Sequence, residues 1–229
     1  MIFKSLSPEK NSIFLENKNT LVYLFVLVLF ISFPVNKVKA QPLYTNSNSM
    51  VWDYIKRHAD SIPPKKTRKR LEKFEHLINY YSTLSFSRAG HTVSSNFLRA
   101  LVSAESAANP YAVSDKNAIG LSQITPATGK MAAKELYELD FDFKYVDEQK
   151  LKNLQPSDLF DPAINLLICV YLMDKYNRDY GNNLVLTISA WNAGPGSIKQ
   201  YNGYPPYEET LNLVGRVNSY YHYYRKYYL

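Results

Sequence analysis

The 229-residue sequence predicts an all-α protein, and three observations lead to this expectation. Apolar residues recur at the three- and four-residue spacing of an amphipathic helix in most segments after residue 50. Where such a pattern begins, proline repeatedly follows a hydroxyl or acidic residue, which is typical of helix starts. No segment shows a convincing alternation of apolar and polar residues over the length of a strand.

The first 40 residues differ from the rest of the chain. Leu21 to Phe33 is a run of thirteen residues, all apolar except Ser32, and it is preceded by three lysines. A run of this length spans a bilayer poorly but suits the central region of a secretory signal. The small residues Val38 and Ala40 predict cleavage before Gln41, and an uncleaved membrane anchor is the alternative. Both readings predict an exported protein of the periplasm or cell envelope.

Composition limits the classes of partner and site. The net charge is +7, and removal of residues 1–40 would take away five lysines and two acidic residues, which leaves +4. This mild, dispersed basicity suits an anionic envelope polymer or a membrane surface and does not predict a nucleic-acid partner. The one cysteine, Cys169, lies in an apolar stretch and is expected to be a small buried residue. Scattered histidines and the lack of a glycine-rich phosphate loop predict neither a metal site nor a cofactor.

Three helices are expected in the first half of the chain. The first begins with the helical pattern of Trp52 to His58 and is interrupted at Pro63 and Pro64. The next covers Thr67–Tyr81 and carries one apolar face, as a packing helix does. Ser94 or Ser95 can cap the third, which is expected to end near Asn109 because the residue before proline disfavours helix.

Four further helices are expected after residue 120. Two of them begin with a capping side chain followed by proline, a hydroxyl in one case and a carboxylate in the other. The helix after the carboxylate is very apolar and is therefore expected to be central. The expected segments are a helix from Thr125 to about Leu139, a long connection over 140–160, a helix from Asp161 to before Gly181, a helix over 184–191, a turn over 192–201 and a tyrosine-rich last helix from Glu208 or Glu209 onward.

Glu105 is the most unusual residue of the third helix. It follows Leu98 by seven residues and Leu101 by four, so it lies on the apolar face of the helix. Burial there, beside the negative C-terminal end of the helix dipole, favours the neutral acid. Such a carboxyl can serve as the general acid that cleaves a glycosidic bond, and an exposed or ion-paired glutamate is the alternative.

Three stretches carry a family resemblance, and they occur in the order ESAANPYAVSDKNAIGLSQITPATG, LFDPAINLLICVYLMDKY and SAWNAGPGSIKQYNGYPPYEET. Together they resemble the successive motifs of lytic transglycosylases with a soluble-lytic-transglycosylase (SLT) domain, goose-type-lysozyme-like enzymes that cleave peptidoglycan. The resemblance covers about residues 94–224. It implies a lysozyme-like catalytic domain at 94–229, preceded by an N-terminal helical region at 41–93 and by the signal or anchor at 1–40.

The resemblance also implies roles for individual residues. Glu105 matches the catalytic glutamate of the family. The positions that accompany it or face substrate are matched by Ser106, Ser114, Gln123, Trp191, Asn192 and Glu209. Three residues depart from the family pattern. Trp191 and Leu213 stand where the family has tyrosines, and Ser122 stands where methionine is common, so a cleft floor of altered polarity is expected.

The implied reaction is cleavage of the β-1,4 bond between N-acetylmuramic acid and N-acetylglucosamine with formation of a 1,6-anhydro-muramyl end, Glu105 serving as acid and then as base. A hydrolytic muramidase is one alternative, but it needs a second carboxylate. The nearest one in sequence, Asp115, is expected to be a solvated turn residue. A catalytically silent peptidoglycan-binding scaffold is the other alternative, suggested by the two missing tyrosines.

The implied partner is therefore the glycan strand of peptidoglycan, and the protein is expected to be a monomer. Small enzymes of this family also open the wall locally for secretion or conjugation systems. The resemblance thus raises an association with a membrane-bound machine of that kind, although no motif for such a partner stands out in the sequence.

Overall fold

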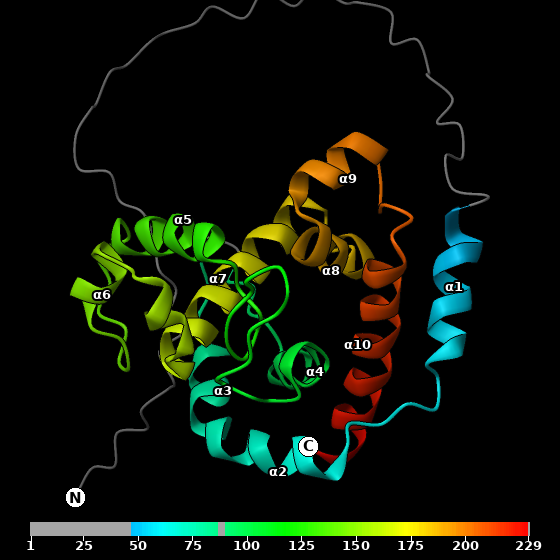
Figure 1. Ribbon diagram of the computed structural model, residues 1–229, viewed down its shortest axis with the longest axis horizontal. Coiled ribbons are helices and arrows are strands. Elements are labelled where there is room, and N and C mark those ends of the chain that lie inside the picture. The colour runs from blue at the N-terminus through cyan, green and yellow to red at the C-terminus, as the bar shows by residue number, and fades with distance from the viewer. Residues whose placement is uncertain (1–46, 87–89, 229) are drawn as a thin grey trace, which may run out of the picture.

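The computed structural model describes residues 47–86 and 90–228 (Figure 1). Within these ranges the regular elements are all helices and no β-strand is formed, which confirms the all-α prediction. The predicted signal or anchor at residues 1–40 lies outside the described residues. In the part of the chain that is described, no helix is long and apolar enough to cross a membrane.

The N-terminal region forms short helices that pack around the rest. These are α1 (Ser47–Arg57), α2 (Lys65–Leu71), the 3-10 helix η1 (Glu72–Phe74) and α3 (Glu75–Tyr81). The single helix expected over residues 67–81 is therefore two α-helices joined by a tighter 3-10 turn. Figure 1 shows α1 lying beside the last helix, α10 (Glu208–Tyr227), while α2 and α3 lie along the lower side of the view.

The core is built around α4 (Ser95–Ser106) and α7 (Pro162–Asp179), with α8 (Leu184–Ala193) and α10 packed beside them (Figure 1). Helix α7 is buried along most of its length, including Cys169, which confirms its central place and the role expected of the cysteine. Helix α4 packs on α10, where the hydroxyls of Ser103 and Tyr224 are hydrogen-bonded at 2.8 Å. These contacts hold the C-terminal end of α4 against α10.

A buried ion pair fixes α4 to α3. The Arg99 side chain is only 7% exposed and its Nη2 lies 2.5 Å from Oε2 of Glu75. Its remaining donors reach side-chain oxygens of Ser95, Asn96 and Asn79. A buried guanidinium is tolerated only when its donors are paired in this way. The N-terminal region thus supplies the counter-charge that lets α4 bury Arg99.

Two of the predicted helix caps are present. Thr125 Oγ1 accepts from the backbone N–H of Thr128 at the start of α5 (Pro126–Tyr137). Asp161 Oδ1 accepts from the N–H of Ala163 at the start of α7. Ser94 occupies the N-cap position of α4, but no side-chain hydrogen bond caps that helix. The local sequence signals therefore predicted where α4, α5 and α7 begin. The start of α4 is stabilised by tertiary contacts and not by a side-chain cap.

Two expected connections are partly helical. Residues 140–160 include α6 (Glu148–Lys152) and the 3-10 helix η2 (Pro156–Phe160), and residues 195–201 form α9 (Pro195–Tyr201) where a turn was expected. At the latter place the chain turns at Gly194, whose φ is +83°, and Pro195 then occupies the first position of the new helix. Proline is suited to that position because its φ is already helical and its missing N–H would have no helical partner.

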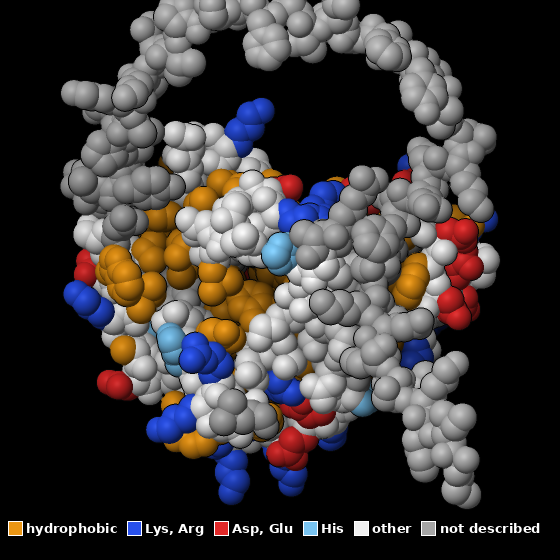
Figure 2. All heavy atoms as spheres, turned by 180° about the vertical axis from the view of Figure 1, so that it is seen from behind, with side chains coloured by type: hydrophobic (Ala, Val, Ile, Leu, Met, Phe, Trp, Pro, Cys, Tyr) orange, Lys and Arg blue, Asp and Glu red, His pale blue; other side chains and the backbone are white. Residues whose placement is uncertain are grey.

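The back of the molecule is seen in Figure 2. Hydrophobic side chains gather near the middle of this face, while Lys and Arg side chains are scattered mainly around its margin. Such scattered cations agree with the modest net charge of the sequence.

Candidate active site

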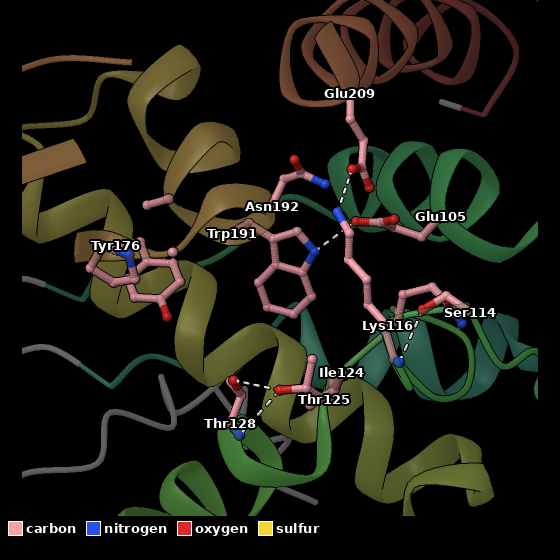
Figure 3. A pocket seen from close by; sticks show the side chains of 15 residues that line it. Glu105, Ser114, Lys116, Ile124, Thr125, Thr128, Tyr176, Trp191, Asn192 and Glu209 are labelled. Atoms are coloured by element: carbon pink, nitrogen blue, oxygen red, sulfur yellow. Dashed lines mark hydrogen bonds and ion pairs between the residues drawn. The ribbon is translucent and has the colours of Figure 1, made fainter. Parts of the chain in front are cut away.

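A pocket of about 190 Å³ lies where α4, α5, α7, α8 and α10 meet the loop before α5 (Figure 3). It is lined by side chains from segments far apart in the sequence. The lining residues that carry polar side chains are Glu105, Ser114, Lys116, Gln123, Thr125, Thr128, Tyr176, Trp191, Asn192 and Glu209. Six of the seven sequence-predicted site residues, all except Ser106, are in this list, so the fold brings the other five together with Glu105.

Glu105 reaches this pocket because α4 ends directly after it. The helix stops at Ser106, and the next two residues, Ala107 and Ala108, have left-handed φ values of 52° and 55°. Alanine rarely adopts this conformation because its Cβ crowds the following carbonyl. The helix therefore ends about three residues before the expected boundary at Asn109. Backbone strain of this kind is common beside functional groups.

Trp191 of α8 holds the carboxyl group of Glu105. Its indole Nε1 donates to Oε1 of Glu105 at 2.8 Å, across 86 residues of sequence (Figure 3). Glu105 is partly buried, and this burial raises its pKa to about 7 against the opposing effects of the Trp191 hydrogen bond and the positive charge of Arg216. The negative charge of Glu209 adds a smaller upward effect. Near neutral pH the group is therefore able to give and to take a proton.

The loop from Gly120 to Gln123, in which Gln123 lines the pocket, is held to α7 by hydrogen bonds of Asn165. This buried amide accepts from the N–H of Ser122 and donates to the carbonyls of Ile119 and Leu159, each at 2.9 Å. Gly120 has a φ of +81°, and a Cβ there would lie 2.4 Å from Asn165 Nδ2 and from Leu159 O. Only glycine fits at this approach of loop and helix.

Three predicted site residues belong to this loop region or border it. Ser114 lines the pocket, and its Oγ accepts from the N–H of Ala118. Gln123 also lines the pocket, while its Nε2 donates to Gly120 O at 2.9 Å. Ser106 is not among the lining residues: its hydroxyl donates to Leu121 O at 2.7 Å and so ties the end of α4 to the loop.

Asn192 and Glu209 form the opposite wall with Lys116. Asn192 Oδ1 accepts from the buried Thr210 hydroxyl at 2.6 Å, which fixes the amide at the start of α10. Lys116 Nζ lies 2.5 Å from Glu209 Oε2, and this contact, together with the Asn192 amide, lowers the pKa of Glu209. Thr210 is thus a buried structural residue, whereas its neighbour Glu209 faces the pocket (Figure 3).

The prediction that Ser122 and Leu213 change the polarity of the cleft floor is wrong. Ser122 and Leu213 are 0% and 1% exposed, and neither lines the pocket, because both point into the core behind the loop and behind α10. Asp115 is exposed in the turn after Ser114, as expected, and does not line the pocket. Of the three departures from the family pattern, only Trp191 faces the site.

Sequence reasoning missed two cations near the site. Lys116 was not singled out although it follows Ser114 by two residues, since its partner Glu209 is 93 positions away. Arg216 lies on α10 two turns after Glu209 and acts electrostatically on both glutamates. Helical spacing from Glu209 would have placed Arg216 on the same face. Among residues 47–86 and 90–228, no group of three His, Cys, Asp or Glu side chains could hold a metal ion.

Comparisons with known proteins identify the family of the chain. The model of the Transglycosylase SLT domain family matches residues 85–214. A putative soluble lytic murein transglycosylase of Haemophilus influenzae is 31% identical over 146 residues, which are 58% of this chain and 22% of that protein. A membrane-bound lytic murein transglycosylase C of Mannheimia succiniciproducens is 28% identical over 147 residues, 60% of this chain and 37% of that protein.

The fold has solved counterparts. The 70 kDa soluble lytic transglycosylase of Escherichia coli superposes with a TM-score of 0.53 and 24% sequence identity, over 79% of this chain and 29% of that one. This likeness supports the lysozyme-like fold. The chain spans about a fifth of the length of the curated relative from Haemophilus influenzae. Since the family match covers more than half of its residues, the chain belongs to the Transglycosylase SLT domain family.

Proposed function

We propose that this protein is a peptidoglycan lytic transglycosylase that cleaves the β-1,4 bond between N-acetylmuramic acid and N-acetylglucosamine and leaves a 1,6-anhydro-muramyl end. The observation that carries the proposal is Glu105, a partly buried carboxyl group with a pKa of about 7 in a pocket of the SLT fold. Relatives named lytic murein transglycosylases support the same class of reaction. The proposal needs no metal and no cofactor.

In the proposed reaction Glu105 acts twice. Its protonated carboxyl gives the proton to the glycosidic oxygen as the bond from this oxygen to C1 of the muramyl residue breaks. The resulting carboxylate then takes the proton of the C6 hydroxyl, and O6 forms a bond to C1. No water is consumed and Glu105 ends protonated. A pKa near the working pH suits both steps, because neither protonation state is too stable.

The remaining predicted residues are proposed to bind or to position. Trp191 holds Oε1 of Glu105 and presents an aromatic face to the pocket, which suits a sugar ring. Ser114, Gln123, Asn192 and Glu209 line the same pocket and are proposed to contact the glycan. Ser106 is proposed to position the glutamate through its hydrogen bond to the loop.

A hydrolytic muramidase is favoured by one observation, the presence of a second carboxylate in the pocket. The pKa of Glu209 is lowered, so it is charged when Glu105 is protonated, as a water-activating or charge-stabilising partner would be. However, Lys116 and Asn192 already bind this carboxylate. We therefore favour a reaction with one carboxyl group. Glu209→Gln tests the alternative, since retained activity of this variant would exclude a muramidase that uses Glu209 as its second carboxylate.

The experiment is digestion of sacculi by the purified protein, with the released muropeptides measured by mass. A transglycosylase releases anhydro ends, and each product of hydrolysis is heavier by one water. Glu105→Gln should lower the rate at least about a hundredfold, because general acid catalysis contributes this much or more. Glu138→Gln is the matched control, as Glu138 is exposed and lies outside the pocket.

Other outcomes would replace the proposal. Products one water heavier would establish a muramidase. Binding to sacculi without release of fragments would favour the catalytically silent scaffold. Equal activity of Glu105→Gln and Glu138→Gln would remove Glu105 from the mechanism.

Location and organisation follow from the same proposal. We propose an exported envelope protein that acts on peptidoglycan glycan strands as a monomer, with residues 1–40 as signal or anchor, 41–93 as an N-terminal helical region and 94–229 as the catalytic domain. Membrane-bound and soluble relatives support an envelope location. A secretion or conjugation machine remains the proposed kind of partner.

A further inference from the structure

A second hollow, of about 310 Å³, lies next to the pocket and is lined by His58, Glu209, Asn212 and Arg216. Glu209 lines both, so the hollow adjoins the site of Glu105. One wall comes from the end of α1 and the other from α10. Residue His58 precedes residue 85, where the family match begins. The hollow is therefore shaped by this chain's N-terminal region as well as by the SLT domain.

Arg216 is a cation without a counter-ion in this hollow. Its Nε is buried with no hydrogen-bond partner, and none of the ion pairs in the described part of the chain includes Arg216. The nearby Glu209 carboxylate is bound by Lys116. Enclosed guanidinium groups normally pair with a carboxylate or phosphate. Arg216 thus has donors to offer to an anionic group that enters the hollow.

The neighbouring side chains add donors to the same place. A hydrogen bond of 3.0 Å joins His58 Nε2 to Asn212 Oδ1, and because Oδ1 can only accept, the amide N–H groups of Asn212 remain to donate. The walls are held closely together at Gly215, where a Cβ would lie 2.6 Å from Tyr54 O and 2.7 Å from His58 Cδ2. Glycine at this position lets α1 approach α10, which fixes His58 beside Arg216.

We propose that this hollow is a subsite for a carboxylate of the glycan substrate, bound by Arg216 and by the amide N–H groups of Asn212, whose orientation His58 fixes. The inference rests on the proposed function. Two carboxylate sources exist in peptidoglycan, the lactyl group of a muramyl residue without a peptide and the peptide stem of a substituted one. N-Acetylglucosamine carries neither. The subsite would therefore make the protein prefer muramyl-containing strands to chitin-like ones.

The test is a binding measurement on the full chain in a Glu105→Gln background, so that cleavage and the charge of Glu105 do not interfere. Calorimetry compares three ligands: a chitin oligosaccharide, a stem-free peptidoglycan fragment with lactyl carboxylates, and a fragment with peptide stems. Arg216→Gln should weaken binding of at least one carboxylate ligand about tenfold or more and change chitin oligosaccharide binding less than about twofold. The ligand that loses affinity identifies the source of the carboxylate.

Two features keep the result unambiguous. Binding of the chitin oligosaccharide reports that Arg216→Gln is folded, and Arg216→Lys, which keeps the charge, should restore part of the preference. An equal loss for all ligands, or no loss for any, overturns the subsite. The proposed function can stand even when the subsite fails. Release of anhydro fragments by the wild-type protein in the digestion experiment would show this. If none of the ligands binds to the parent Glu105→Gln variant, the subsite proposal fails, and the digestion experiment decides the proposed function separately.

Discussion

Trp191 and Glu105 are joined by a hydrogen bond of 2.8 Å from the indole Nε1 to Oε1, at a position where the family resemblance predicts a tyrosine. An indole N–H can only donate, so it stabilises the carboxylate and opposes the rise in pKa that burial causes. The substitution thus retains a donor and an aromatic face at this position. This relationship weakens the case for a silent scaffold, because the loss of the hydroxyl does not leave Glu105 without a partner.

The first prediction concerns the alkaline limit of activity. Trp191→Phe removes the donor, so the carboxylate is less stable, the pKa of Glu105 rises, and the decline of kcat/KM that is expected above about pH 7 moves to higher pH. We expect kcat/KM near pH 6 to fall about tenfold as well, because the carboxyl group loses its orientation. Trp191→Tyr, which keeps a donor, should change both quantities less. A pH limit that stays in place in Trp191→Phe would contradict this reading.

The second prediction links Glu105 to folding. Its folded pKa of about 7 exceeds the ordinary value of 4.5, so the native state binds the proton more tightly and stability falls as pH rises between these values. The Glu105→Gln substitution removes this loss of stability at higher pH, because glutamine does not titrate. The variant should exceed wild type in free energy of unfolding by on the order of 2 kcal/mol at about pH 8, and by little at about pH 4. Urea unfolding at several pH values measures this.

Glu138→Gln serves as the control for that experiment. Glu138 is exposed in a loose pair with Lys134, with 3.9 Å between Nζ and Oε1. Its difference from wild type should be small at both pH values. A stability difference for Glu105→Gln that does not grow with pH would show that the glutamate is not held protonated by its surroundings.

The third prediction concerns Asn165. Asn165→Leu has a similar shape but leaves the N–H of Ser122 and the carbonyls of Ile119 and Leu159 without their partner. We expect a loss of about 3 kcal/mol in the free energy of unfolding, since each buried unpaired group is costly. Asn153→Leu, on the surface, should cost less than about 0.5 kcal/mol. Similar losses for both variants would show that the loop does not depend on Asn165.

The fourth prediction uses the strained end of α4. Ala107 is exposed with a φ of 52°, so Ala107→Gly should raise the free energy of unfolding by roughly 0.5 to 1 kcal/mol. The exposed Ala127 in α5 is the opposite control, where glycine should lower stability by up to about 1 kcal/mol. Thermal or urea unfolding measures both. A loss of stability in Ala107→Gly would mean that its methyl group makes contacts that outweigh the strain.

Local signals allowed much of the helical organisation to be predicted. The caps at Thr125 and Asp161 depend on side chains within a few residues of the backbone groups they bind, and the apolar face that carries Glu105 depends on spacing within one helix. The motif order correctly predicted the family. By contrast, α9 was missed, since glycine and proline signal a turn and a helix start equally well.

By itself, then, the sequence determined most of the longer helices, the family and the residue type at the centre of the site, because helix periodicity, caps and motifs are properties of short stretches. Only the tertiary structure decided which distant side chains meet: Trp191 with Glu105, Asn165 with the loop after Gly120, and His58 with Asn212. It also placed Ser122 and Leu213 in the core. These outcomes depend on how whole helices pack, which is set by the sum of many contacts and cannot be read from the spacing of a few residues.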